Sequence, residues 1–247
     1  TTSSPIRHRT VAVNGINMHI AEQGEGPLML MVHGFPELWY SWRHIIPAVA
    51  GAGYKAVAPD MRGYGQTDAP KEIDAYTMNH HVADLVALVK LLGYEQAVIM
   101  GHDWGASAAS TAAAMRPDVF RALVLLSVPY GARGEGGLKP TEGMQRRVPA
   151  GQQFYQYYFQ APGVAEKELE ADIRKSLRML YYSTSGSIPK EHRWRYVFGK
   201  NEKALDGCVD PGEKLPSWLK PEDLEYFVKE FSRTGFRGGL NWYRAQD

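Results

Sequence analysis

Residues 97–105, AVIMGHDWG, decide the fold of this chain. A short apolar run ends at Gly101, Asp103 follows two positions later, and Gly105 precedes the small-residue stretch 106–115. A short apolar run closed by glycine is typical of a strand buried in a parallel sheet, and a small-residue helix can pack tightly against such a strand. The segment therefore predicts a strand, a sharp turn and a helix, with Asp103 at the turn.

The turn at Asp103 has the form of a nucleophile elbow, in which small neighbours allow a tight bend and the helix N-terminus favours negative charge. A serine or cysteine is common at its centre, where it attacks acyl groups. A carboxylate is a poor acyl-transfer nucleophile, but it can attack a saturated carbon and form an ester. The competing interpretation is an aspartate that only caps the helix. The strand–turn–helix context favours the nucleophile.

The sequence around this segment repeats the alternation of short strands and helices. Asn14-Gly15 between two alternating runs predicts a hairpin, and the apolar spacing of 80–92 predicts a helix ended by Gly93. These features predict a doubly wound α/β domain over 1–130. Besides 97–100, the expected strands are 10–13, 18–21, 28–32, 56–58 and 122–127.

Composition changes after Tyr130. The stretch 131–143 contains five glycines and one proline, which is typical of a linker. Helical patterns follow near 150–160, 165–182 and 221–234, and no run after 131 is a convincing strand. We therefore expect 131–247 to form a second, mainly helical domain joined to the first by this linker.

Charge and cysteine content exclude several classes of protein. Lys plus Arg (28) nearly equals Asp plus Glu (27), so a nucleic-acid or anionic-membrane binder is not expected. The longest apolar runs have five residues, too few to span a membrane. One cysteine, Cys208, excludes an intrachain disulfide framework and suits a reducing compartment. We expect a cytoplasmic protein, and a homodimer is compatible with the sequence.

A second motif, HGFPE at 33–37, directly follows the expected strand 28–32. A loop there can aim a backbone N–H toward the elbow and, with the N–H of Trp104, form an oxyanion hole. His33 is expected to be structural, hydrogen-bonded beneath this loop. His102 is not expected to be a base, because the elbow turns neighbouring side chains away from each other. No histidine spacing fits a metal site.

Three motifs together, HGFPE, PDMRGYGQTD (59–68) and GHDWG (101–105), resemble those of the epoxide hydrolases of the α/β-hydrolase superfamily. The resemblance continues into the second unit at 154–170 and 235–244. It implies an α/β-hydrolase fold, with a mostly parallel sheet flanked by helices, and a mainly helical cap domain over 131–247.

The resemblance also implies the residues of the site. Asp103 is the nucleophile, and Tyr155 and Tyr243 donate hydrogen bonds to the epoxide oxygen. A phenol with a pKa near 10 can supply a proton to the alkoxide that ring opening generates. The backbone N–H groups of Phe35 and Trp104 form the oxyanion hole, and Phe35, Pro36 and Trp104 line the substrate pocket. The implied substrate is a small-molecule epoxide, with no cofactor and no metal.

No residue of this sequence matches the family's general-base histidine or its orienting acid, which the resemblance places beyond Asp247. The last two strands of the family's sheet are likewise expected to be absent. The strand at 122–127 would then be an open apolar edge. We expect residues 1–247 alone to be poorly soluble and to lack sustained turnover.

Two alternatives stay open at this stage. A haloalkane dehalogenase also uses an aspartate followed by tryptophan, but it would need halide-binding donors in place of the two phenols. The second alternative is a protein of the same fold that is catalytically incomplete, including a binding protein without activity. Intact Asp103, Tyr155 and Tyr243 favour the epoxide hydrolase.

Overall fold

The computed structural model describes residues 5–131 and 138–247. The chain divides into two compact units, 1–134 and 135–247. Of the linker expected at 131–143, residues 132–137 lie outside the described residues. Its end was predicted wrongly, because residues 140–143 form the start of a helix, α4 (Pro140–Gln145), with Pro140 at its first turn.

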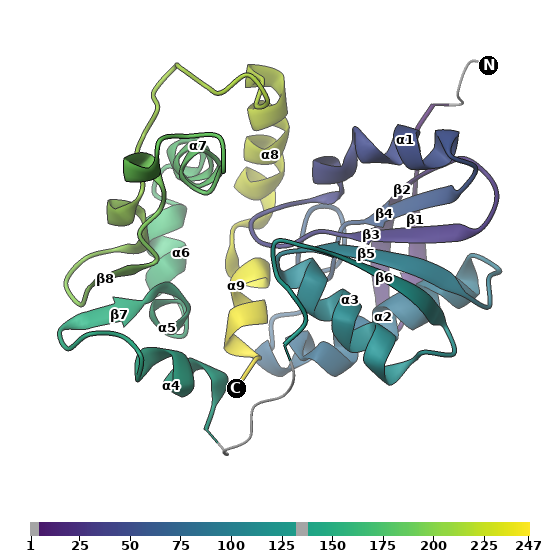
Figure 1. The fold of residues 1–247 in the computed structure, drawn as a ribbon, viewed down its shortest axis with the longest axis horizontal. Helices are drawn as coiled ribbons and strands as arrows, with labels where there is room; N and C mark the ends of the chain where they lie inside the picture. Colours follow the sequence, from purple (N-terminus) through teal and green to yellow (C-terminus); the bar gives the residue numbers. More distant parts are fainter. Residues whose placement is uncertain (1–4, 132–137) are drawn as a thin grey trace. The chain divides into compact units, whose positions relative to one another are not determined.

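Unit 1 is built on a six-stranded sheet in the order β1-β2-β4-β3-β5-β6 (Figure 1). The pairs β4–β3, β3–β5 and β5–β6 are parallel, whereas β1–β2 and β2–β4 are antiparallel. The prediction of six strands in a mostly parallel sheet is confirmed. The strands are β1 (Arg7–Val13), β2 (Ile16–Gln23), β3 (Leu28–Val32), β4 (Lys55–Pro59), β5 (Ala97–His102) and β6 (Phe120–Leu126).

Helices flank both faces of this sheet. α1 (Ile45–Gly51) lies on one face, and α2 (Met78–Leu91) and α3 (Trp104–Met115) lie on the other (Figure 1). α2 and α3 match the helices expected from the sequence. α1 was not predicted, because it is short, contains Pro47 and buries only Ile46. Two short 3₁₀ helices, η1 (Trp39–Trp42) and η2 (Ile73–Tyr76), complete the unit.

The predicted hairpin is present between β1 and β2. Asn14 and Gly15 both have positive φ, 46° and 79°. A two-residue turn of this kind matches the twist of the strands that it joins. Val13 and Ile16 therefore pair directly on either side of the turn.

The outer strand β6 exposes apolar side chains. Leu123, Val124 and Leu126 are 36%, 36% and 39% exposed, and among the described strands β6 pairs with β5 alone. The sequence pattern of 122–127 is that of a strand buried on both faces, so its exposure here fits the expectation of an open apolar edge. An edge of this kind presents unpaired backbone groups to other chains.

Unit 2 is mainly helical, as expected, but it also contains two short strands. β7 (Gln152–Phe154) and β8 (Val197–Gly199) form a small antiparallel sheet, so the expectation of no strand after 131 was wrong. Three-residue strands are too short for the period-two pattern that marks a strand. The helices are α4 (Pro140–Gln145), α5 (Tyr155–Tyr158), α6 (Val164–Leu169), α7 (Ile173–Ser183), α8 (Pro221–Thr234) and α9 (Arg237–Arg244), with 3₁₀ turns η3 (Lys190–His192) and η4 (Ala204–Gly207).

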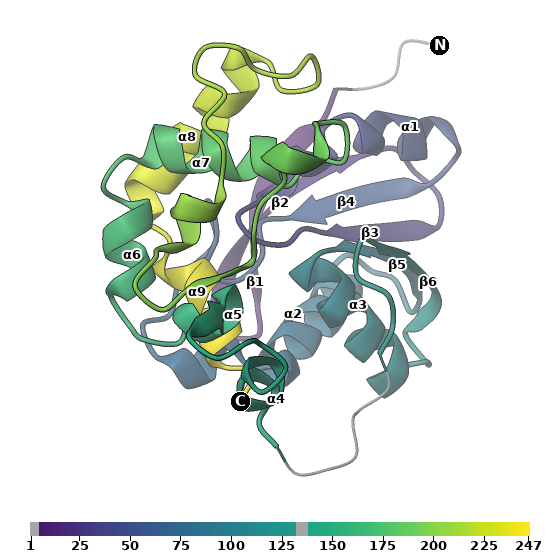
Figure 2. The same cartoon turned by 60° about the vertical axis from the view of Figure 1, so that its left-hand side comes forward.

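Two of the helices expected in unit 2 are shorter than predicted. The region 150–160 is helical only in α5, and the region 165–182 is split into α6 and α7. The split occurs because the Asp172 side chain accepts a hydrogen bond from the Lys175 N–H and starts a new helix. α8 has the predicted bounds. It packs beside α7 (Figure 2), where the Tyr181 and Phe227 ring centroids are 5.0 Å apart.

Within residues 5–131 and 138–247, no helix combines the length and the apolar character that crossing a bilayer requires.

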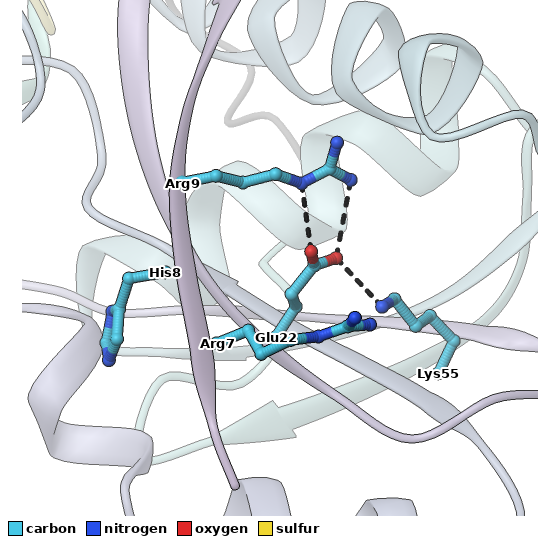
Figure 3. Close-up of a pocket in the computed structure, with 5 residues that line it drawn as sticks. All are labelled: Arg7, His8, Arg9, Glu22 and Lys55. Atoms are coloured by element: carbon cyan, nitrogen blue, oxygen red, sulfur yellow. Dashed lines mark hydrogen bonds and ion pairs between the residues drawn. The ribbon is translucent and has the colours of Figure 1, made fainter. Parts of the chain in front are cut away.

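A carboxylate ties three strands of unit 1 together in a surface pocket (Figure 3). Glu22 on β2 lies 2.9 Å from the Arg9 guanidinium on β1 and 2.8 Å from the Lys55 ammonium on β4. Arg7 and Arg9 extend to the same side of β1, whereas His8 points to the other side. Burial alone would raise the pKa of Glu22, but the hydrogen bonds from Lys55 and Arg9 outweigh it and lower the pKa.

Replacing Glu22 by glutamine should therefore destabilise the chain in a pH-dependent way. A carboxyl group with a lowered folded-state pKa stabilises the fold above its unfolded pKa and loses this effect as pH falls through the folded pKa. We expect Glu22→Gln to cost about 1 kcal/mol near pH 7 and nothing near pH 2. Urea unfolding at both pH values measures the difference. Asp118→Asn, in the exposed pair with Arg116, is the control and should have a much smaller effect.

Candidate active site

The order of the strands brings the two motifs of unit 1 together. β3 and β5 are neighbours and run parallel, with Val32 opposite Gly101 in the register. The carboxyl ends of neighbouring parallel strands meet at one edge of a sheet, which is where α/β proteins place their sites. The loop 33–37 after β3 therefore lies beside the turn after β5.

Asp103 occupies a sharp turn between β5 and α3. Its φ of 56° and ψ of −126° lie outside the regions that a non-glycine residue normally adopts. Such a backbone persists only where the surrounding structure enforces it. The predicted strand–turn–helix geometry is thus present, with the side chain of Asp103 at its apex.

Three glycines allow this turn, because a side chain at any of them would clash. A methyl group on Gly101 would overlap the backbone of Gly105, and one on Gly105 would overlap the backbone of Val32. A methyl group on Gly34 would overlap the Asp103 side chain itself. The glycines of the two motifs are therefore a packing requirement of the site.

Two backbone N–H groups hold the Asp103 carboxylate. The N–H of Phe35 donates to Oδ1 at 2.9 Å, and the N–H of Trp104 also hydrogen-bonds to the carboxylate. Burial raises the pKa of Asp103, and the nearby charge of Glu37 adds to this effect. The two N–H groups and His102 act in the opposite direction, and the net pKa is raised. The structure brings Phe35, Asp103 and Trp104 together, as the sequence predicted.

Glu37 links the loop to the elbow, a role that the sequence analysis missed. Its Oε2 accepts the Gly34 N–H at 2.8 Å and also accepts a hydrogen bond from His102 Nδ1 at 2.8 Å. Burial alone would raise the pKa of Glu37, but His102 outweighs it, and the pKa is lowered. Glu37 in turn raises the pKa of His102. The sequence did contain a signal for this role, because Glu37 lies three residues after Gly34, whose backbone N–H needs a hydrogen-bond acceptor.

The two histidines beside the site have other partners. His33 Nδ1 donates to the Gly34 carbonyl at 2.9 Å, and its Nε2 accepts the Met61 N–H at 2.9 Å. This arrangement requires a neutral ring, and burial lowers the pKa of His33 accordingly. His102 bonds to Glu37, and its Nε2 lies 3.0 Å from the Ser127 hydroxyl. Each ring nitrogen of His33 and His102 therefore has a hydrogen-bond partner, and these contacts explain both residues without a catalytic role.

In unit 2 the structure brings together the two tyrosines that the sequence singled out. Tyr155 starts α5 and Tyr243 lies in α9, and their ring centroids are 5.9 Å apart. The Phe159 ring packs against both, at 5.5 Å from Tyr155 and 5.1 Å from Tyr243. Trp194 also packs against Tyr155, at 4.7 Å.

The tyrosines next to Tyr155 in the sequence lie in different surroundings. The Tyr158 hydroxyl donates to Glu168 at 2.9 Å. Burial raises the pKa of Tyr158, and this hydrogen bond raises it further. Tyr157 is 47% exposed. These contacts support Tyr155 as the partner of Tyr243.

A buried arginine fixes the helix that carries Tyr243. The Arg244 guanidinium forms a two-pronged ion pair with Glu166, at 2.6 and 2.8 Å, and its Nε donates to the Phe159 carbonyl at 3.0 Å. The Gln160 amide donates to the Tyr243 carbonyl at 2.9 Å. Helices as short as α5 and α9 are not stable by themselves. These ties therefore set the spacing of the two phenol rings.

The described residues contain no group of three or more His, Cys, Asp or Glu side chains placed to hold a metal ion. The loop 33–37 and the elbow offer backbone N–H groups, which bind negative charge rather than cations.

Adding a methyl group at Gly34 should disrupt the contact between the loop and the elbow. We expect Gly34→Ala to lower the free energy of unfolding by about 1–3 kcal/mol, because the new side chain overlaps Asp103. Gly51→Ala is the control in the same unit, since nothing lies within 4 Å of an added methyl there. Equal stabilities of the two variants in urea titrations would contradict the packing argument.

Comparison with known proteins places the chain in a family. Residues 27–233 match the model of the alpha/beta hydrolase fold family. "Epoxide hydrolase 2" of Siraitia grosvenorii is 43% identical over 244 residues, which cover 97% of this chain and 72% of that protein. "Epoxide hydrolase A" of Mycobacterium tuberculosis is 40% identical over 242 residues, 97% of this chain and 74% of that protein. The solved epoxide hydrolase from an endophytic Streptomyces has a TM-score of 0.93 and 47% identity, covering 98% of this chain and 72% of that one. The chain therefore belongs to the α/β-hydrolase fold family and, within it, to the epoxide hydrolases.

Proposed function

We propose that this epoxide hydrolase opens a small-molecule epoxide to a vicinal diol through an ester formed at Asp103. The observation that carries the proposal is the position and hydrogen bonding of the Asp103 carboxylate. It stands at a strained turn with Oδ1 held by the Phe35 N–H, which leaves Oδ2 as the attacking atom. Unit 2 would serve as the cap, with its two tyrosines directed at the same substrate, as the resemblance to the family implies.

In the first step, Asp103 Oδ2 attacks one epoxide carbon, and the carbon–oxygen bond of the ring breaks. The electron pair of that bond passes to the epoxide oxygen, which Tyr155 and Tyr243 stabilise by hydrogen bonding and proton donation. A positioned acid of this kind contributes roughly 10²–10⁴-fold in rate. The 5.9 Å separation of the two rings is compatible with both hydroxyls reaching one oxygen.

In the second step, water attacks the carbonyl carbon of the Asp103 ester. The negative charge that develops on the carbonyl oxygen lies on the former Oδ1, to which the Phe35 N–H already donates, and the Trp104 N–H, which also bonds to the carboxylate, lies close by. Donors fixed in advance at such an oxygen lower the barrier without reorganisation. When this charge returns to the carbonyl, the bond from the Asp103 carbonyl carbon to the ester oxygen breaks, the diol leaves with that oxygen, and the carboxylate is restored with one oxygen from water. We assign the general base of this step to no residue of this chain.

The haloalkane dehalogenase alternative is less well supported. Its substrate releases a halide, for which two phenols are not the expected donors. The paired rings of Tyr155 and Tyr243 and the named relatives both support an epoxide. Diol release from styrene oxide, against halide release from a brominated alkane, separates the two functions.

Isotope labelling tests the nucleophile. If Asp103 attacks carbon, a single turnover of styrene oxide by the complete enzyme in ¹⁸O-water should give an unlabelled diol, because its new oxygen comes from the carboxylate. Asp103→Asn should abolish ester formation, measured as a mass increase of the protein after rapid quenching. The variant should keep its fold, because the amide is nearly the same shape. Label in the first-turnover diol would mean direct attack by water and would refute the ester.

Removal of one phenol hydroxyl tests the acid. Tyr155→Phe and Tyr243→Phe should each slow ester formation by roughly 10- to 10³-fold, because each loses one donor to the developing alkoxide. Tyr157→Phe is the control, since this ring is exposed and lies outside the pair. Wild-type rates of ester formation in both single variants would show that the acid is another residue.

A further inference from the structure

The side chain next to Tyr155 in the sequence is hydrogen-bonded to its hydroxyl group. Gln156 Nε2 donates to the Tyr155 phenol oxygen at 2.9 Å. At its other end, Gln156 Oε1 accepts a hydrogen bond from Gln246 Nε2 at 3.2 Å. Because Gln246 occupies the carbonyl end of the amide, the N–H end of Gln156 faces Tyr155.

The backbone around Gln156 is tied to the other tyrosine. Gln160 Nε2 donates to the Gln156 carbonyl at 2.9 Å and to the Tyr243 carbonyl at 2.9 Å. One amide group therefore joins α5 to α9. Gln156 is held at both its side chain and its backbone, and it is placed with respect to both phenols.

The hydrogen bond has two consequences for the chemistry of Tyr155. A phenol oxygen that accepts an N–H must direct its own hydrogen elsewhere, so Gln156 restricts the rotation of the hydroxyl. An N–H donor also stabilises the phenolate more than the phenol, and hydrogen bonding to the charged form favours that form. Gln156 therefore orients the Tyr155 hydroxyl group and provides a donor that favours its phenolate form.

We propose that Gln156 is a positioning residue for ring opening, which acts by turning the Tyr155 hydroxyl hydrogen toward the epoxide oxygen and by stabilising the phenolate left behind. The inference rests on the proposed function. As the Asp103–carbon bond forms and the epoxide carbon–oxygen bond breaks, the Tyr155 proton passes to the alkoxide. The negative charge then lies on the Tyr155 oxygen, where it accepts the Gln156 N–H, until water returns a proton.

The first test removes the donor and keeps the volume. In the full chain, Gln156→Leu should slow ester formation from styrene oxide by about tenfold, the value of one net hydrogen bond. The epoxide concentration that gives half the maximal rate should not change, because the proposed role of Gln156 is exerted through the Tyr155 hydroxyl group. Gln153→Leu is the matched control, since Gln153 is also half-buried but, within the described part of the chain, its amide donates to backbone carbonyls and not to a phenol. It should form the ester at the wild-type rate.

The second test uses pH to restore the donor. In Gln156→Glu the ionised carboxylate cannot donate, so ester formation at pH 7 should be slower than in wild type. Below the ordinary glutamate pKa of about 4.3, the neutral acid regains an O–H donor. The ratio of the variant rate to the wild-type rate should therefore rise as pH falls, and dividing by the wild-type rate removes the titration of Asp103. A merely structural role for Gln156 predicts a constant ratio.

A third measurement does not depend on activity. Alkaline ultraviolet titration of wild type and Tyr155→Phe isolates the ionisation of Tyr155 by difference. The same subtraction in the Gln156→Leu background should show a higher Tyr155 pKa, because the phenolate has lost its donor. An unchanged Tyr155 pKa would overturn the inference.

Combined variants separate this inference from the proposed function. Gln156→Leu should have no further effect on the ester-formation rate in a Tyr155→Phe background. If Tyr155→Phe itself reacts at the wild-type rate, the proposed role of Tyr155 fails. If Tyr155→Phe is slow but Gln156→Leu reacts at the wild-type rate, or slows both backgrounds equally, only the role of Gln156 fails.

Discussion

The parallel pairing of β3 with β5 is the constraint on which the chemistry of unit 1 depends. It sets Val32 opposite Gly101, so the chain leaves both strands at the same edge of the sheet. The loop and the elbow then meet at van der Waals distance, which is possible only because Gly34 and Gly105 carry no side chain. A shift of register would separate the Phe35 N–H from the Asp103 carboxylate.

The electrostatic state of Asp103 reflects a balance that the same packing creates. Burial and the neighbouring carboxylate of Glu37 favour the neutral acid, whereas the backbone N–H groups and His102 favour the anion. Glu37 has two opposing effects on Asp103. Its charge raises the pKa of Asp103 directly, and it also raises the pKa of His102, whose positive charge lowers the pKa of Asp103. Because this compensation of the burial is only partial, the pKa of Asp103 stays raised. A carboxylate that is not fully stabilised would suit the role of nucleophile that we propose for Asp103.

In unit 2, the phenol rings of Tyr155 and Tyr243 lie close together although the helices that carry them are very short. α5 and α9 have too few residues to be stable by local hydrogen bonds alone. Their positions come from the Arg244–Glu166 ion pair, from the Phe159 ring between the two tyrosines, and from the glutamine amides. Because the guanidinium is buried and bonded to both a carboxylate and backbone carbonyls, the helix end has little freedom to move.

The sequence by itself determined the strands of the sheet and the position of the elbow. Short apolar runs, glycine spacing and the Asn14-Gly15 turn are local signals, because strand burial and turn geometry constrain each residue type directly. The tertiary structure alone decided what those residues touch. Glu37 meets His102 across 65 positions, and Arg244 meets Glu166 across 78, with no local pattern linking either pair. The short strands β7 and β8 were also missed, because three residues are too few for a period-two pattern. The helix α9 was missed because it has only eight residues and contains two glycines, Gly238 and Gly239.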